Sequence, residues 1–89
     1  MHEHAIMADL MRQILRAAEQ ENASGVVGVS VWLGALSHMT PAHFAEHFEQ
    51  AAAGTIAEGA AIHAVASDDI HDPNATGVVL TGVEVEAAG

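Results

Sequence analysis

Residues 27–34 read Val-Gly-Val-Ser-Val-Trp-Leu-Gly, and this stretch determines the fold class. Its apolar residues recur at every second position, which is the period of a strand that is half-buried on one face. A strand of this kind is stable only where another layer covers its apolar face. The segments on either side must therefore supply that layer.

The segment before the strand has the pattern of an amphipathic helix. Residues 5–20 place apolar side chains at three- and four-residue steps: Ile6, Leu10, Met11, Ile14, Leu15 and Ala18. Ser24 and Gly25 follow the apolar stripe and are interpreted as a stop signal. We therefore expect one apolar helical face directed at the strand.

The segment after the strand predicts a second helix. Thr40 is expected to cap it, and Pro41 is tolerated at a first helical position because its missing N–H is not needed there. Phe44 and Phe48 then lie on one face. The helix should end at Gly54.

Two further strands complete the predicted fold. Gly59 precedes a strand from about Ala60 to Ala66, and the last strand runs from Val78 to Glu86. Residues expected on one face of the last strand are Val79, Thr81, Val83 and Val85. The order helix, strand, helix, strand, strand predicts a two-layer α+β domain, with two helices on one face of a three-stranded sheet. Residues 1–89 are expected to form this single domain.

The composition excludes several classes of protein. Two basic residues against twelve acidic ones give a formal charge of −10, which cannot neutralise a nucleic-acid backbone or an anionic membrane surface. No apolar run reaches the ~20 residues of a membrane span, and no signal peptide is visible. Without cysteine there is no disulfide, thiol nucleophile or thiolate zinc site. A cytoplasmic protein that binds neither nucleic acid nor membrane is expected.

The core is expected to be thin. Hydrophobic residues make up 51% of the chain, but nineteen residues are alanine. A partner subunit, or a second copy of this chain, is one way to cover the remaining apolar surface. No signature of an enzyme is present, neither a nucleophile elbow nor a phosphate-binding loop nor a His-Glu-x-x-His helix. We therefore expect no catalytic activity.

The N-terminus is the first candidate metal site. It reads Met1-His2-Glu3-His4, and a free α-amine, deprotonated amides and a nearby imidazole suit square-planar Ni(II) or Cu(II). Methionine should be retained before the bulky His2, which keeps the Met1 amine as a ligand. Glu3 and His4 are further candidate ligands. The alternative is a frayed terminus that binds nothing.

A second candidate site lies on the second predicted helix. His43 and His47 are four residues apart, so both project from one helical face. Such a pair can clamp zinc, nickel or copper. The alternative interpretation, two solvated histidines at the margin of the apolar face, is the one that the pattern favours.

The remaining polar cluster is interpreted as a turn. Asp68, Asp69, His71 and Asp72 lie in the loop before the last strand and lack the glycine and the terminal glutamate of a calcium loop. His63 alternates with apolar neighbours in a strand, where a single histidine is usually exposed or structural.

Three segments in order carry a family resemblance. They are the Met1-His2-Glu3 start with its helix, the strand from Val27 through Ser37, and Phe44 to Ile62, in which Phe48-Glu49 precedes Gly54-Thr-Ile-Ala-Glu-Gly59. The closing Val83-Glu-Val-Glu86 fits as well. The chain resembles the HypA/HybF family of hydrogenase nickel-incorporation proteins over residues 1–66 and 78–86.

The resemblance implies a nickel-binding α/β domain whose site uses the N-terminal amine, neighbouring amides and His2, with support from Glu3. It also implies delivery of nickel to the large subunit of a [NiFe] hydrogenase, with a GTPase partner, or to urease. The family carries a zinc domain with two Cys-x-x-Cys pairs before the last strand. Only the loop 67–75 stands there in this chain, so a HypA-like nickel domain without its zinc module is expected.

Two functions follow from these observations. The first is a metal-binding accessory protein, for nickel, that acts in hydrogenase maturation. The second is a non-catalytic interaction or scaffold subunit of a hydrogenase or related complex, which has kept the fold but lost metal delivery.

Overall fold

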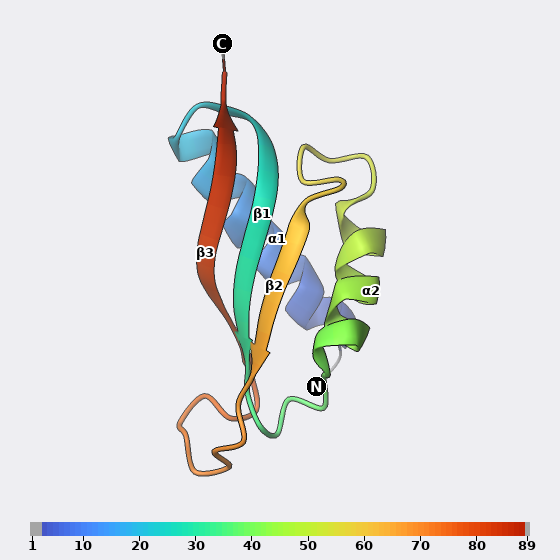
Figure 1. Ribbon diagram of the computed structural model, residues 1–89, viewed down its shortest axis with the longest axis vertical. Coiled ribbons are helices and arrows are strands. Elements are labelled where there is room, and N and C mark those ends of the chain that lie inside the picture. Colours follow the sequence, from blue (N-terminus) through green and yellow to red (C-terminus); the bar gives the residue numbers. More distant parts are fainter. Residues whose placement is uncertain (1–2, 89) are drawn as a thin grey trace.

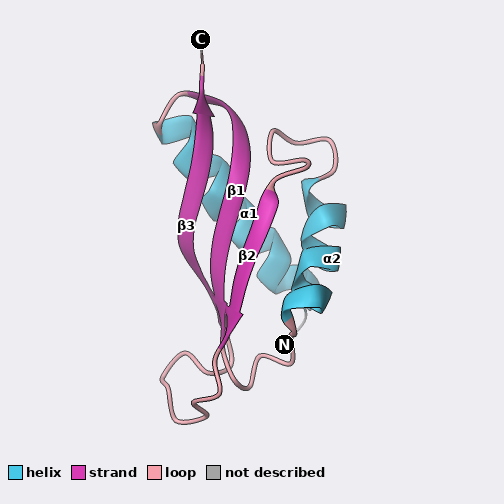
Figure 2. Ribbon diagram, viewed as in Figure 1, coloured by secondary structure: helices cyan, strands magenta, loops and turns pink. Residues whose placement is uncertain are grey.

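Two helices and three strands form the fold, in the predicted order (Figures 1 and 2). The computed structural model describes residues 3–88, apart from the side chain of Glu3. The elements are α1 (Glu3–Gln20), β1 (Ala23–Leu33), α2 (Pro41–Ala52), β2 (Ala61–Ala66) and β3 (Val78–Ala87). The predicted α+β class is thereby confirmed.

The three strands form one mixed sheet with β1 in the centre. The order is β2-β1-β3, with β1 parallel to β2 and antiparallel to β3. A parallel pair needs a crossover connection, and α2 provides it. In Figure 1, α1 crosses behind the strands and α2 lies beside β2, and buried residues of both helices belong to one cluster with the inward residues of β1.

The core forms where the helices meet β1. Ile14 of α1 and Phe44 and Phe48 of α2 are at most 2% exposed. They pack with the inward residues of β1, namely Val26, Val29, Val31 and Leu33. The two phenylalanine rings are stacked with centroids 6.3 Å apart. These two aromatic side chains are among the largest that are fully buried.

The start of β1 differs from the sequence interpretation. Ser24 and Gly25 do not end an element, because β1 already begins at Ala23. The chain reverses at Asn22, whose φ of 52° lies in the left-handed region that asparagine tolerates. The side chain of Ser24 then donates to the carbonyl oxygen of Glu86 on β3, at 3.3 Å. The reversal therefore takes place within a two-residue turn.

A β-bulge changes which valines of β1 are buried. The register with β3 shifts between Val26 and Gly28, which places one extra residue in β1. Val26 is 3% exposed and Val27 is 49% exposed. The expectation that Val27 faces the core with Val29 was therefore wrong, because strict alternation does not hold across a bulge.

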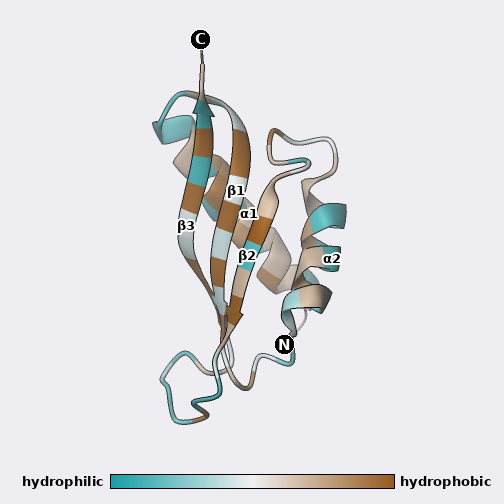
Figure 3. Ribbon diagram, in the orientation of Figure 1, coloured by the Kyte–Doolittle hydropathy of each residue, from teal (hydrophilic) through white to brown (hydrophobic). Residues whose placement is uncertain are grey.

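A second bulge affects β3 in the same way. Ser30 pairs with Gly82 but Val31 pairs with Leu80, so Thr81 is the extra residue. Val83 and Val85 pack against the core, whereas Val79 and Thr81 are exposed. The prediction that all four share one face was wrong for Val79, which precedes the bulge, and for Thr81, the bulge residue itself. Figure 3 shows the bands of apolar and polar residues along β3.

The boundaries of α2 agree with the sequence signals. The Thr40 hydroxyl accepts a hydrogen bond from the His43 N–H at 3.1 Å, and Pro41 occupies the first helical position. The helix ends at Ala52, and Gly54 follows with a φ of 81°. The cap fixes where the first turn begins and hence where His43 projects.

The face of the sheet opposite the helices bears an apolar row. Trp32 of β1 pairs with Val65 of β2 on one side and with Val79 of β3 on the other. Val65 is 64% exposed and Val79 is 37% exposed. No element among residues 3–88 covers this row. Within the same residues, no helix has the length and hydropathy needed to cross a bilayer.

The connection from β2 to β3 crosses the end of β1 at Gly34. The N–H of Gly34 donates to the carbonyl of Gly77 at 2.9 Å, and that of Leu36 donates to the carbonyl of Ala75 at 2.7 Å. A Cβ atom at Gly34 would overlap the carbonyl group of Ala75. The crossing therefore requires glycine for close backbone approach.

The burial difference between matched valines predicts their contribution to stability. Val29→Ala removes two methyl groups from a fully buried site, so it should lower the free energy of unfolding by about 2 kcal/mol. Val65→Ala, which removes the same atoms from an exposed site, should change it by less than about 0.5 kcal/mol. Urea denaturation followed by circular dichroism measures both. Equal losses would contradict the assignment of the two faces.

The crossing predicts a glycine-specific effect. Gly34→Ala should lower the free energy of unfolding by about 2 kcal/mol, because the loop backbone must move to admit the methyl group. The matched control is Gly25→Ala, since a Cβ there meets only the carbonyl oxygen of Ile56 at 3.7 Å, an ordinary contact. Thermal unfolding of both variants would reveal the difference. A Gly34→Ala variant as stable as Gly25→Ala would refute the crossing.

Candidate metal centre

The N-terminal candidate ligands lie at the start of α1. Met1 and His2 lie outside the described residues, as does the side chain of Glu3. Glu3 is the first residue of α1, and His4, whose side chain is exposed, follows in the first turn. The first N–H groups of a helix have no acceptor within the helix. The amides at this terminus are thus not committed to the helical hydrogen-bond ladder.

A groove runs between α1 and α2 next to this terminus. Its volume is about 760 Å³. The lining residues are His4, Met7, Ala8, Met11, Arg12 and Leu15 from α1, and His47, Gln50 and Ala51 from α2. The packing of the two helices therefore brings His4 and His47 to one groove, although 43 positions separate them in the sequence.

The histidine pair on α2 is in direct contact. Nε2 of His47 lies 2.8 Å from Nε2 of His43, so one ring nitrogen donates a hydrogen bond to the other. The ring centroids are 4.6 Å apart and the planes are tilted by 40°. Both side chains are half-buried. The predicted i, i+4 proximity is present, and both side chains lie at the margin of the buried face.

The core holds this pair in place. Each histidine directly precedes a phenylalanine, Phe44 or Phe48, that is almost fully buried. Because the phenylalanines fix the rotation of α2 about its axis, the histidines must point along the margin of the buried face. The Thr40 cap fixes the start of the same turn. The buried phenylalanines and the Thr40 cap thus help to set the direction of both imidazoles.

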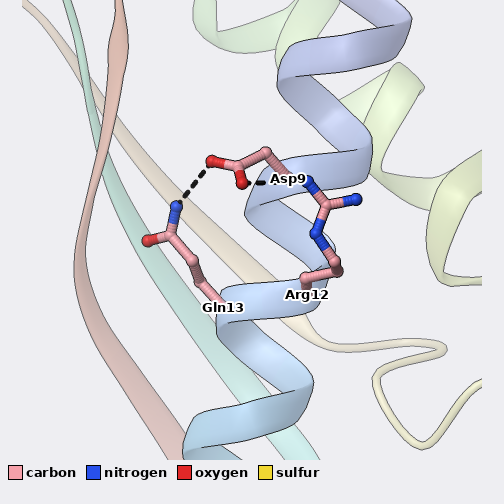
Figure 4. A network of polar contacts seen from close by, with 3 residues as sticks. All are labelled: Asp9, Arg12 and Gln13. Atoms are coloured by element: carbon pink, nitrogen blue, oxygen red, sulfur yellow. Dashed lines mark hydrogen bonds and ion pairs between the residues drawn. The ribbon is translucent and has the colours of Figure 1, made fainter.

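The positive charge beside the groove is locally offset. The chain has two basic residues, Arg12 and Arg16, and both lie on α1. Asp9 Oδ1 forms an ion pair with Arg12 Nη2 at 3.0 Å, and Asp9 Oδ2 accepts from Gln13 Nε2 at 2.9 Å (Figure 4). An exposed ion pair contributes little to stability. Its relevance is that the one cation lining the groove has a carboxylate next to it.

The acidic loop is organised as a turn. Asp69 Oδ1 accepts from the N–H of His71 at 2.9 Å, and Asp72 Oδ1 accepts from the N–H of Asn74 at 2.7 Å. These are the local side-chain bonds that aspartate makes in turns. His63 is exposed on β2. Across the described part of the chain, no three His, Asp or Glu side chains converge as a metal site.

The sequence did not reveal the groove or its two methionines as part of a site. Met11 was predicted only as part of the apolar helical stripe and Met7 was not singled out, and both are mostly buried. Their exposed edges also line the groove with His4 and His47. The angle at which two helices pack is set by side chains far apart in sequence, so no local pattern contains this information.

The sequence matches a family model described as "Hydrogenase/urease nickel incorporation, metallochaperone, hypA" over residues 1–70. The hydrogenase maturation factor HypA of Picosynechococcus sp. is 42% identical over 60 residues, which are 67% of this chain and 53% of that protein. The HypA of Thermococcus kodakarensis is 40% identical over 70 residues, 79% of this chain and 50% of that protein. The chain therefore spans about half the length of the curated relatives it matches.

The fold is also that of a solved relative. The solution structure of the Ni metallochaperone HypA from Helicobacter pylori superimposes with a TM-score of 0.78 at 20% identity, covering 99% of this chain and 100% of that one. At this identity the match establishes the shared fold. The family match over residues 1–70 shows that this chain belongs to the HypA family of hydrogenase and urease nickel-incorporation proteins.

Proposed function

We propose that this chain is a nickel metallochaperone that captures Ni(II) with its N-terminal nitrogens. The observation that carries the proposal is the family match, which begins at residue 1 and includes the Met1-His2-Glu3 start. The Met1 amine, the following amides and the His2 imidazole supply the ligands, and Glu3 supports them. Nitrogen-rich planar sites of this kind suit Ni(II). His4 is a further candidate ligand.

The beginning of α1 at Glu3 supports this chemistry. Amide nitrogens bind nickel only after they lose their protons, and an amide inside a helix would also lose a hydrogen bond. The first N–H groups of α1 have no such bond to lose. Deprotonated amides are moreover anionic, and negative charge is favoured at the N-terminal end of a helix. The net charge of −10 adds a general attraction for cations.

The proposed recipient is a nickel enzyme of the hydrogenase or urease class. The matched relatives are named hydrogenase maturation factors, which favours the large subunit of a [NiFe] hydrogenase, with a nickel-handling GTPase as the intermediate partner. Delivery takes place in the cytoplasm by ligand exchange, for which a planar site with open axial positions is suited. The chain itself performs no catalysis.

We further propose that nickel capture does not need a thiolate zinc module. The chain contains no cysteine, and the β2–β3 connection crosses at Gly34 through its own backbone hydrogen bonds. The buried cluster that joins α1 and α2 contains no residue of that connection. Residues 1–89 thus act as a single nickel domain.

Nickel titration of the untagged protein tests the proposal. Isothermal titration calorimetry should show one tight Ni(II) site per chain with a Kd below about 1 μM, equivalent to about −8 kcal/mol. His2→Ala should weaken it at least about tenfold, because one imidazole ligand is lost. Acetylation of the Met1 amine should have the same effect.

His71→Ala is the matched control, because His71 is exposed in the acidic loop on the β2–β3 connection. It should leave the tight site unchanged. A tight site that survives both His2→Ala and acetylation would overturn the N-terminal assignment. Absence of any tight Ni(II) binding would remove the metallochaperone proposal itself.

A further inference from the structure

We infer that the sheet face opposite the helices (the open face) is the contact surface of a homodimer, against which a second copy of this chain packs its own open face. The open face is turned towards the viewer in Figure 1, because α1 crosses behind the strands. Its apolar row consists of Val65 on β2, Trp32 on β1 and Val79 on β3, which are direct neighbours in the sheet register.

The apolar row is a continuous surface rather than a set of scattered side chains. Val65 and Val79 are exposed, and Trp32 is partly exposed between them. Side chains at paired positions of neighbouring strands contact each other, so the three form one strip across the whole sheet. Contiguous apolar surface marks an interaction site, and tryptophan is among the side chains that contribute most to such contacts.

The distribution of charge favours a second copy as the occupant. The chain carries a net charge of −10, so two copies repel each other wherever their carboxylates meet. The apolar row and the next register position, formed by His63, Ser30 and Gly82, contain no carboxylate. On the open face Glu84 lies further along β3, with its carboxylate over Gly28. A basic partner would be attracted to the carboxylates elsewhere, whereas two acidic copies need a contact surface without charge.

A twofold axis along the apolar row meets this requirement. If the axis runs from Val65 to Val79, each side chain of the row contacts its own counterpart, as in any isologous interface. The same rotation reverses the direction of the strands, so the two Glu84 carboxylates lie at opposite ends of the interface. Sheets packed face to face lie about 10 Å apart, a gap that interdigitating side chains fill. The dimer therefore has four layers, with the helices outside and the two sheets inside.

The exposed area of the chain is large enough for this interface. Its accessible surface is 5454 Å², whereas a folded monomer of 9.2 kDa is expected to expose about 4,900 Å². The excess of about 500 Å² per chain gives about 1,000 Å² for two copies, which is near the lower limit of a specific interface. We therefore expect a weak, reversible dimer rather than an obligate one.

Sedimentation equilibrium of the full chain in the presence of a metal chelator tests the inference. Between about 5 μM and about 500 μM, the weight-average mass should rise from 9.2 kDa towards twice that value. Trp32 is the one tryptophan of the sequence, so its emission reports on the open face and should shift to shorter wavelength over the same range. The chelator prevents a metal ion from bridging two copies.

Arginine variants locate the contact. Val65→Arg and Val79→Arg should each raise the dissociation constant of the dimer at least about tenfold, because each places two like charges opposite one another across the axis. Gln20→Arg is the matched control, since it makes the same change in charge at an exposed position at the end of α1. It should leave the dissociation constant within about twofold of the original value. Circular dichroism checks that each variant keeps its fold.

The outcomes are separable from those of the nickel titration. A chain that is still monomeric at about 500 μM would overturn the inference and leave the open face to another protein. A dimer with unchanged Trp32 emission, or one that all three arginine variants weaken equally, would place the contact elsewhere and also overturn it. A monomer that binds Ni(II) tightly leaves the proposed function intact, whereas a dimer of the predicted kind without tight Ni(II) binding supports the inference and removes the proposed function.

Discussion

The burial of Phe44, Phe48 and Ile14 against one face of β1 is the contact on which the rest of the structure depends. Few large apolar side chains are available in this alanine-rich chain, and these three are almost fully removed from water. Their burial holds α1 and α2 in one layer (Figure 1). Because α2 also forms the parallel crossover from β1 to β2, the same contact fixes the sheet order.

The groove follows from that layer. Two helices on one face of a narrow sheet must contact each other, and here the start of α1 lies against α2, where His4 and His47 line a common cavity. The first turn of α1 and the second half of α2 therefore border the same groove. The packing of the core thus brings His4 and His47 to the same groove, although neither histidine is part of the core.

Periodicity was sufficient to predict the elements and insufficient to predict every face. The order of elements, the Thr40 cap and the i, i+4 histidine pair all depend on local signals, and all are present. Val27, Val79 and Thr81 face the opposite way from the prediction because each bulge adds one residue to a strand. Nothing in the composition of Val-Val-Gly or Leu-Thr-Gly distinguishes a bulge from continued alternation. The register is decided by pairing between strands distant in sequence.

The crossing at Gly34 fixes where the β2–β3 connection passes the end of β1. Because β2 and β3 flank β1, any chain joining them must pass the end of β1. The passage is made by backbone groups, with Leu33, Gly34 and Leu36 bonded to residues on both sides of the loop. Side chains of the loop interior, such as Asp69 and Asp72, bond only within the loop. The backbone bonds at the crossing therefore tie the loop to the end of β1, while the aspartate side chains organise the loop itself.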